Sequence, residues 1–254
     1  MIPISAYVLT KNSEKHLAEI LQKLHYVADE ILVIDSGSTD ATEKIAKQLN
    51  DVTFLLHPFA NFKEQRLFAE RTARHDMILF LDCDEVPDHD FVVALRKMKS
   101  EGFHQDAYAV KRTWWVLGKQ VHTIYPVMSP DFPVRLYNRN VTSFQRSPIV
   151  HEMPEGHTGE GVIAGNVRHY TFETEEELQQ KLELYTDLAA RDLVQKKKPI
   201  HFLKQVFSPP AAWFKWYFVK KGYKDGWLGF QLSRYAFNYT RKKYIKAAQL
   251  LKAG

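Results

Sequence analysis

The hydrophobic pattern of the chain is densest at residues 77–81, where five apolar residues follow one another without a break. This run is too short for a core helix and is bounded by polar residues before it and by acids and Pro87 after it, so it predicts a buried strand. Asp82 and Asp84 would then lie at the carboxyl end of that strand, where ligands bind in open α/β sheets and where two acids can share a divalent cation. The alternative is that both acids only end the strand and cap the next helix.

Shorter apolar runs predict three more strands before this one, at residues 4–9, 30–34 and 52–56. Helices are predicted between them. The first carries apolar residues at helical spacing from Leu17 to Leu24, the second begins near Asp40 with Glu43 completing a capping box, and the third covers residues 61–74. The alternation predicts an α/β fold with a mostly parallel, doubly wound sheet flanked by helices.

The pattern changes after Asp84. A helix at 88–99 and a strand at 107–112 precede an irregular, aromatic and proline-rich region at 114–133. Further strands are predicted at 134–137 and 162–170, the second outside the parallel core, and a long helix starts at Thr174 with Glu177 completing its capping box. We therefore expect two domains, a catalytic domain at 1–172 and a helical extension at 173–254.

Charge separates the two ends of the chain more than the net charge of +5 suggests. Residues 194–254 hold 14 Lys and Arg against one acid, which leaves 21 against 29 for residues 1–193, so the two segments carry +13 and −8. The same C-terminal segment holds 14 of the 33 aromatic residues. No apolar run reaches the length of a membrane-spanning helix, and the N-terminus lacks the pattern of a secretory leader, so we expect a cytoplasmic protein.

Interleaved cations and aromatic residues in this C-terminal segment have three interpretations. Trp and Tyr favour the membrane interface and Lys or Arg binds an anionic leaflet, which predicts peripheral attachment to a membrane. The same composition suits single-stranded nucleic acid, in which bases stack and phosphates pair with cations. It also suits a helical hairpin whose aromatic side chains pack on the rest of the protein.

Three sequence elements, Lys11–Glu14, Ile34–Asp40 and Phe80–Glu85, occur in this order. Together they resemble the family 2 glycosyltransferases, whose GT-A fold is a Rossmann-like, nucleotide-binding α/β domain with an Asp-x-Asp metal motif. The later Val150–Glu152 and the basic aromatic extension are similar to the subgroup that adds hexoses to the inner core of bacterial lipopolysaccharide.

The resemblance implies roles for individual residues. It places Asp35 against the nucleotide base and Thr10 and Glu14 close to base and ribose, while Asp82 would meet ribose or metal. Asp84 would ligate Mg²⁺ or Mn²⁺ bridging the diphosphate of a nucleotide sugar, most simply a UDP-sugar. Ser36 departs from the common Asp-Asp-Gly-Ser pattern, whereas Asp35 matches it.

Candidates for the chemistry itself lie further along the chain. A sugar that leaves a nucleoside diphosphate develops negative charge on the β-phosphate, so Arg66 and Arg71 are candidates to stabilise it, unless they only form a solvated helix face. The acceptor hydroxyl needs a base.

Family members place an acid there, which Glu152 matches, with His151 as its competitor, Asp131 as a weaker rival and a local structural pair as the alternative. A late histidine often adds a metal ligand in GT-A enzymes, which suggests His169, although a lone strand histidine is more often a core residue.

The sequence thus predicts an inverting, metal-dependent hexosyltransferase that moves a hexose, glucose by the resemblance, to a lipid-linked saccharide such as the lipopolysaccharide core. We expect it on the cytoplasmic face of the inner membrane, with no nucleic acid partner. A nucleotidyltransferase of sugar phosphates is the enzymatic alternative, but the first strand is not followed by a glycine-rich phosphate loop. The remaining alternative is a basic nucleic-acid-binding protein, whose affinity would fall steeply with salt.

Overall fold

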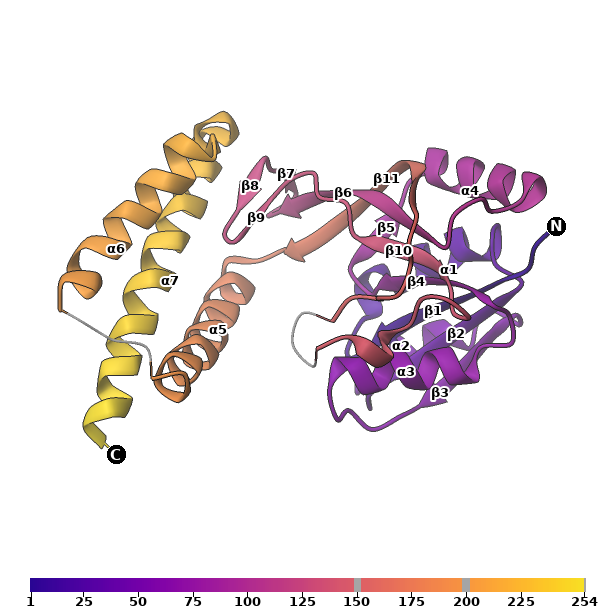
Figure 1. Ribbon diagram of the computed structural model, residues 1–254, viewed down its shortest axis with the longest axis horizontal. Helices are drawn as coiled ribbons and strands as arrows, with labels where there is room; N and C mark the ends of the chain where they lie inside the picture. Colours follow the sequence, from indigo (N-terminus) through magenta and orange to yellow (C-terminus); the bar gives the residue numbers. More distant parts are fainter. Residues whose placement is uncertain (149–151, 198–201, 254) are drawn as a thin grey trace. The chain divides into compact units, whose positions relative to one another are not determined.

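The computed structural model describes residues 1–148, 152–197 and 202–253 (Figure 1). The chain divides into two compact units. Unit 1 comprises Met1–Arg112 and Phe132–His169, and unit 2 comprises Thr113–Asp131 and Tyr170–Gly254. Residues 113–131, which the sequence-based division assigns to the first domain, thus group with the C-terminal helices.

The main sheet has the strand order β3-β2-β1-β4-β10-β6-β11-β5. Its strands are β1 (Ile4–Thr10), β2 (Glu30–Asp35), β3 (Val52–Leu56), β4 (Met77–Asp82), β5 (Glu85–Pro87), β6 (Ala107–Val116), β10 (Val134–Asn138) and β11 (Glu160–Phe172), with β7 (Lys119–Gln120) paired to β6. Strands β3, β2, β1 and β4 are parallel, as predicted, and β10 continues the sheet antiparallel to β4. The α/β fold with a parallel core and a helical C-terminal part is confirmed.

The register of the parallel strands determines what meets at their carboxyl ends. On β1, Thr10 lies beside Asp35 of β2, and the preceding Leu9 lies beside Asp82 of β4. The long strand β11 runs antiparallel to β5 and brings His169 beside Glu85. Residues from five strands are therefore gathered at one edge of the sheet.

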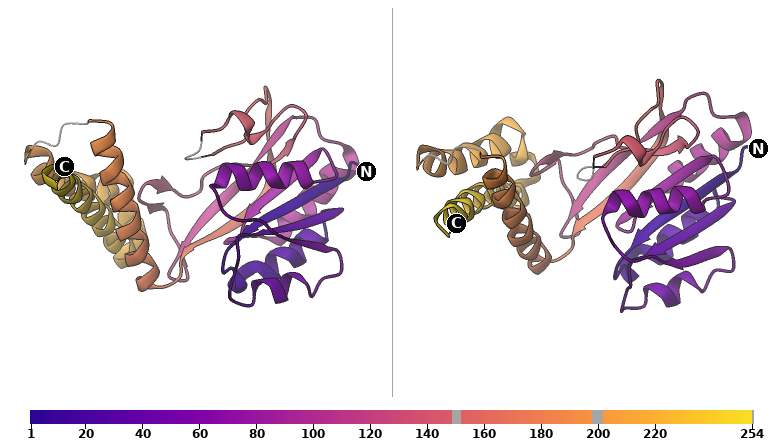
Figure 2. Two further views of the ribbon diagram at one scale, coloured as in Figure 1. Left: turned by 90° about the horizontal axis from the view of Figure 1, so that it is seen from below. Right: turned by 60° about the horizontal axis from the view of Figure 1, so that its bottom comes forward.

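Helices cover both faces of the parallel strands (Figure 2). These helices are α1 (Glu14–His25), α2 (Thr42–Ala46), α3 (Phe62–Thr72) and α4 (His89–Glu101). On one face, α3 and the short helix η1 (Phe144–Arg146) pack on alternate strand residues such as Tyr7, Ile34 and Phe80. The intervening strand residues are buried as well, which explains why β1, β2 and β4 read as continuous apolar runs.

Two expectations about helix starts have different outcomes. Thr174 does cap the long helix α5 (Glu175–Gln195), because its hydroxyl accepts from the backbone N–H of Glu177. The capping box at Asp40 and Glu43 is wrong: α2 begins only at Thr42, and Asp40 instead accepts from the backbone N–H groups of Thr42 and Glu14. Asp40 therefore caps the beginnings of two helices.

Unit 2 is built on three helices, α5, α6 (Phe202–Phe214) and α7 (Gly226–Ala253), together with the hairpin of β8 (Thr123–Ile124) and β9 (Val127–Met128). Between α6 and α7 lie the π-helix η2 (Lys215–Val219) and the 3₁₀ helix η3 (Gly222–Asp225). Asp225 joins the hairpin to this connection, since its carboxylate accepts from the backbone N–H of His122 at 2.9 Å and of Thr123 at 3.3 Å. None of the helices in the described ranges is long and apolar enough to cross a bilayer.

Gly165 allows β11 to pass closely over the first turn of α4. Its φ is +97°, and a Cβ built there would lie 2.2 Å from the backbone nitrogen of Phe91. That nitrogen donates to the capping carboxylate of Asp88 at 2.8 Å. A side chain at position 165 would therefore push apart the strand that carries His169 and the helix that follows the acidic motif.

We expect Gly165→Ala to lower the free energy of unfolding by about 3 kcal/mol, because it adds a backbone clash to an unfavourable φ. Thermal unfolding followed by circular dichroism measures the change. Gly102→Ala is the matched control, because Gly102 also has a positive φ of +100° but has no atom within 4 Å of the added Cβ. Equal losses in the two variants would show that the close approach contributes nothing.

Candidate active site

Asp35, at the end of β2, organises the loop that follows it. Its buried carboxylate accepts four hydrogen bonds, from the hydroxyls of Thr10 (2.8 Å) and Ser38 (2.5 Å) and from the backbone N–H groups of Gly37 (2.8 Å) and Ser38 (2.7 Å). Burial raises the pKa of Asp35, but these hydrogen bonds outweigh burial and hold the pKa below its usual value. Since a carboxylate accepts about four hydrogen bonds, a direct contact with a nucleotide base would require Asp35 to release a donor.

A second set of contacts joins this loop to the one after β1. The carboxylate of Glu14 accepts from the backbone N–H of Ala41 at 2.9 Å, while Asp40 accepts from the backbone N–H of Glu14 at 3.2 Å. The ammonium of Lys11 donates to the backbone carbonyl of Gly37. Glu14 therefore holds the two loops together, and its proximity to base and ribose stays a prediction.

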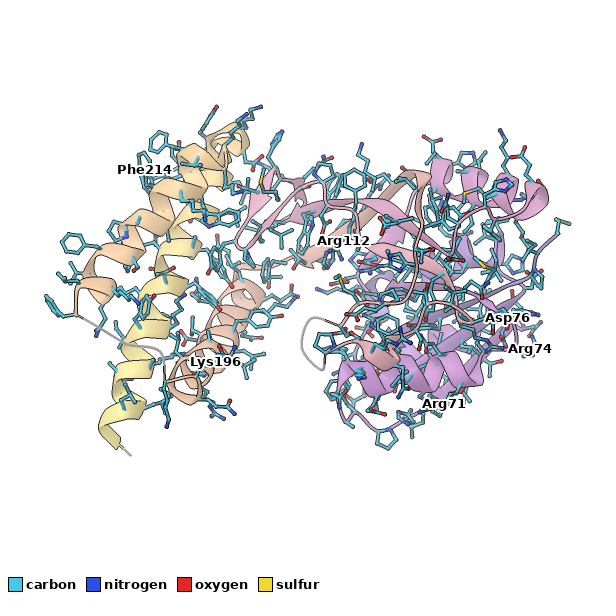
Figure 3. The ribbon with its side chains drawn as sticks, viewed as in Figure 1. Arg71, Arg74, Asp76, Arg112, Lys196 and Phe214 are labelled. Atoms are coloured by element: carbon cyan, nitrogen blue, oxygen red, sulfur yellow. The ribbon has the colours of Figure 1, made fainter. Side chains whose placement is uncertain are left out.

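Asp82, the first acid of the motif, is bound by two arginines. Arg66 of α3 donates from Nη2 to Oδ1 at 2.9 Å, and Arg135 of β10 donates from Nη2 to Oδ2 at 3.2 Å. Both guanidinium groups also lie over the ring of Phe80, at 4.8 and 4.7 Å from its centroid. Arg66 is thus buried, which excludes the solvated helix face, whereas Arg71 on the same helix is exposed (Figure 3).

The buried carboxylate of Glu85 binds Arg135, one of the two arginines that contact Asp82, and also Arg112. The Glu85 side chain has no exposed area, and its carboxylate accepts from Arg135 Nε at 2.7 Å, from Arg135 Nη2 at 2.6 Å and from Arg112 Nη1 at 2.6 Å. Burial raises the pKa of Glu85, but the charges and hydrogen bonds of Arg135 and the charge of Arg112 hold it well below its usual value. Burial likewise opposes ionisation of Asp82, yet Arg66 and Arg135 keep its pKa low. Both acids are therefore ionised at neutral pH.

Glu152 is connected to the same arrangement through Arg66. Arg66 Nε donates to Glu152 Oε1 at 3.2 Å, so a single guanidinium bridges Glu152 and Asp82. The side chain of Glu152 is 13% exposed, which leaves it accessible to an acceptor hydroxyl. Its competitor His151 lies outside the described residues. Asp131 belongs to unit 2, where it accepts from the indole Nε1 of Trp114 at 3.0 Å.

Asp84 and His169 form the pair that could bind a metal. His169 Nε2 and Asp84 Oδ2 are 3.1 Å apart. Burial lowers the pKa of His169, but the charge and hydrogen bond of Asp84 and the charge of Glu85 together raise it above its usual value. Within the described ranges no three His, Cys, Asp or Glu side chains are grouped to hold a metal by themselves. One carboxylate and one imidazole still fit Mg²⁺ or Mn²⁺, which are commonly held by few protein ligands together with substrate phosphates and water.

Cys83 lies between the two acids and takes no reactive role in this geometry. Burial, followed by the charge of Asp84, raises the pKa of its thiol to about 12. A thiol with a raised pKa is a poor nucleophile at neutral pH, so this environment does not favour nucleophilic catalysis by Cys83.

Three members of this arrangement were not identified from the sequence: Glu85, Arg112 and Arg135. Arg112 lies on β6 (Figure 3), Arg135 lies on β10, and these two strands are antiparallel. The one available signal is an arginine inside an apolar strand, as in residues 134–137, because a charge within a buried strand requires a partner.

Comparison with known proteins identifies the class of enzyme. Residues 5–130, which contain the loops at Asp35 and the acidic motif, match the model of the family described as "Glycosyl transferase family 2". This segment, just under half of the chain, is thus similar to the glycosyltransferases of family 2. The alternatives of a nucleotidyltransferase and of a nucleic-acid-binding protein find no support in this match.

Relatives of this glycosyltransferase extend over nearly its whole length. It is 27% identical to the lipopolysaccharide core biosynthesis glycosyltransferase LpsC of Rhizobium meliloti over 262 residues, 97% of this chain and 94% of LpsC. It is 26% identical to the uncharacterized glycosyltransferase RP128 of Rickettsia prowazekii, over 98% of this chain and 87% of RP128.

Solved structures with similar folds include residues 1–349 of S. aureus TarS, at a TM-score of 0.47 and 16% identity over 100% of this glycosyltransferase and 92% of that chain. Another is glucosyl-3-phosphoglycerate synthase from Mycobacterium tuberculosis in complex with Mn²⁺, UDP and phosphoglyceric acid. Its TM-score is 0.40 and its identity 20%, over 55% of this chain and 57% of that one.

We expect Asp35→Asn to lower the free energy of unfolding by about 1–3 kcal/mol at neutral pH, since the amide nitrogen would face hydrogen-bond donors. Because folding lowers the pKa of Asp35, its carboxylate stabilises the protein above about pH 4, and this contribution is lost as the pH falls further. The difference between wild type and variant should therefore shrink in acid. Urea unfolding at pH 7 and pH 3.5 measures it, and a difference that grew on acidification would contradict the assignment.

Proposed function

We propose that this glycosyltransferase transfers a hexose, with inversion, from a nucleoside diphosphate sugar to a lipid-linked saccharide. The observation that carries the proposal is the grouping of Asp84 with His169 and of Glu152 with Arg66 at the end of β4, in a chain whose residues 5–130 match the family 2 model. The first pair suits a metal and diphosphate, and the second suits deprotonation of an acceptor. Binding of the leaving diphosphate and activation of the acceptor are thus assigned to different side chains.

Donor binding is assigned to the carboxyl ends of β1, β2 and β4. Thr10 and the loop shaped by Asp35 would receive the nucleoside, and Asp82 would accept a hydrogen bond from the ribose. Asp84 and His169 would hold Mg²⁺ or Mn²⁺, which when bound supplies positive charge to the leaving diphosphate. Because Asp82 is already paired with two arginines, Asp84 is the better metal ligand of the two.

The transfer step is assigned to Glu152. Its carboxylate takes the proton of an acceptor hydroxyl, whose oxygen forms a bond to the anomeric carbon from the face opposite the diphosphate. The bond from that carbon to the β-phosphate oxygen breaks, and the nucleoside diphosphate leaves with the electron pair. Arg66 orients Glu152 through the 3.2 Å contact. His151 remains the alternative base.

The acceptor class is inferred from the relatives. LpsC is named for lipopolysaccharide core biosynthesis, and this chain aligns with 94% of it. We therefore propose a saccharide of the lipopolysaccharide core as acceptor, glucose from a UDP-sugar as the transferred unit, and the cytoplasmic face of the inner membrane as the place of reaction.

Metal-dependent nucleotide binding tests the donor site. Titration calorimetry of UDP, GDP, ADP and CMP with and without Mn²⁺ should show one nucleoside diphosphate that binds more tightly with metal. Asp84→Asn should remove the metal-dependent part of the affinity, roughly tenfold or more, because it removes a charged ligand. Asp90→Asn, an acid in the first turn of α4, is the control and should bind as wild type. Retention of the Mn²⁺ effect in Asp84→Asn would disprove the metal assignment.

Turnover tests the base separately. Glu152→Gln preserves size and can still accept a hydrogen bond from Arg66, but it cannot take a proton. We expect unchanged nucleotide affinity and a turnover reduced by roughly 10²–10⁴-fold, measured as nucleoside diphosphate released with extracted lipopolysaccharide as acceptor. Asp131→Asn serves as the comparison and should keep wild-type turnover. The reverse result would assign the base to Asp131.

A further inference from the structure

A row of large apolar side chains on α6 and η2 is exposed. Leu203, Phe207, Phe214 and Phe218 are 65%, 64%, 55% and 48% exposed. Their spacings of four, seven and four residues place them along one side of a helix. Phe214 lies on the outer side of α6 (Figure 3). We call these four side chains the α6 row.

Packing within unit 2 does not require the α6 row. The same segment buries Pro209 and Trp216. Trp213 stacks on Tyr217 with ring centroids 5.2 Å apart and meets Phe230 of α7 edge-on at 5.9 Å. The helix pair therefore has an aromatic core of its own. Phe218 of the α6 row borders this core, with ring centroids 5.9 Å from Trp213 and 5.0 Å from Tyr217, and still leaves 48% of its surface exposed. In water such a contiguous apolar surface marks an interaction site.

Lysines follow the α6 row closely in the sequence. Lys204 and Lys215 come directly after Leu203 and Phe214, and Lys221 and Lys224 lie three and six residues after Phe218. All four are exposed, and across the described part of the chain none of them has a carboxylate partner. Asp225 is the single acid among residues 202–253. Its carboxylate already accepts hydrogen bonds from the backbone N–H groups of His122 and Thr123.

Other lysines of unit 2 show the contrast. On α7, Lys246 pairs with Glu183 and Asp187 of α5, both at 2.8 Å, and Lys242 also pairs with Glu183. Cations on the side of α7 that packs against α5 are thus neutralised within the fold. The lysines next to the α6 row are left available to an external anion.

We propose that the α6 row and its neighbouring lysines are the surface by which the protein docks on an anionic lipid bilayer. Phenylalanine and leucine side chains of an amphipathic helix enter the boundary between headgroups and acyl chains, and lysines bind the anionic headgroups. Trp227, 70% exposed at the start of α7, is of the type that favours the same interface. The inference deepens the membrane location proposed above by naming its residues, and it does not depend on the catalytic assignments.

Vesicle sedimentation with the full chain tests the proposal. Wild type should bind vesicles of phosphatidylcholine with 30% phosphatidylglycerol at least roughly tenfold more tightly than pure phosphatidylcholine, and less tightly as salt rises. Phe207→Ser with Phe214→Ser should weaken binding by roughly tenfold or more on both kinds of vesicle. Lys215→Gln with Lys224→Gln should weaken it by a similar factor on the anionic vesicles alone.

The control is Phe59→Ser with Phe62→Ser, two phenylalanines of unit 1 that are each 53% exposed. This variant should bind vesicles as wild type does. The control therefore shows whether weaker binding is specific to phenylalanines of the α6 row or follows the loss of any two exposed phenylalanines. Fluorescence of Trp227 should shift to shorter wavelength on wild-type binding, and Trp227→Phe should remove most of the shift.

Three results would overturn the proposal: no vesicle binding by wild type, unchanged binding by the Phe207 and Phe214 variant, or tighter binding of a single-stranded oligonucleotide than of anionic vesicles. A dimer that is lost in the same variant would instead assign the row to a second copy of the chain. Calorimetric binding of nucleotide to each variant is expected to equal that of wild type, which separates failure of this surface from failure of the donor site.

Discussion

The site depends on two carboxylates next to three arginines, the fully buried Glu85 and the partly buried Asp82. Ionised groups removed from water need nearly complete pairing, and the removal of one partner leaves an uncompensated charge. The three partners come from different parts of the fold: Arg66 from α3, Arg112 from β6 and Arg135 from β10. The antiparallel strands are therefore connected to the chemistry of the parallel ones, because their arginines hold the acidic motif in place.

The pairing with arginines gives Asp82 and Asp84 different environments and therefore different proposed roles. Asp82, held by two guanidinium groups, suits a hydrogen bond to a neutral hydroxyl better than a share of a metal's charge. Asp84 contacts His169, and we assign this pair to the cation. Arg66 also contacts Glu152, so displacement of Asp82 from Arg66 on donor binding would strengthen the contact of Arg66 with Glu152. The proposed base and the donor site are thus electrostatically connected through one side chain.

The local pattern of the sequence was sufficient for β1, β2 and β4 and for the placement of Asp35 and Asp82 at strand ends, because buried parallel strands are continuous apolar runs. It also located the partly exposed strand β3 and the helices α1 and α3. It was not sufficient for Arg135. Its partner Glu85 lies 50 residues away in the sequence, and their contact depends on the antiparallel pairing of β10 with β4. Local reasoning also misplaced the start of α2, since Asp40 contacts Glu14 of another helix, which no capping pattern within one segment can show.

Charge segregation along the chain determines how an anionic surface would act on it. Residues 194–254 carry +13 and residues 1–193 carry −8, so attraction and repulsion act on different parts of one molecule. At physiological salt each force extends only about 8 Å from the surface. Only groups within that distance are attracted, and the available lysines lie beside the apolar residues that can enter the bilayer. The acidic residues 1–193, which contain every candidate catalytic residue, oppose this attraction only where they come within the same distance, so an anionic surface acts chiefly on the basic C-terminal segment.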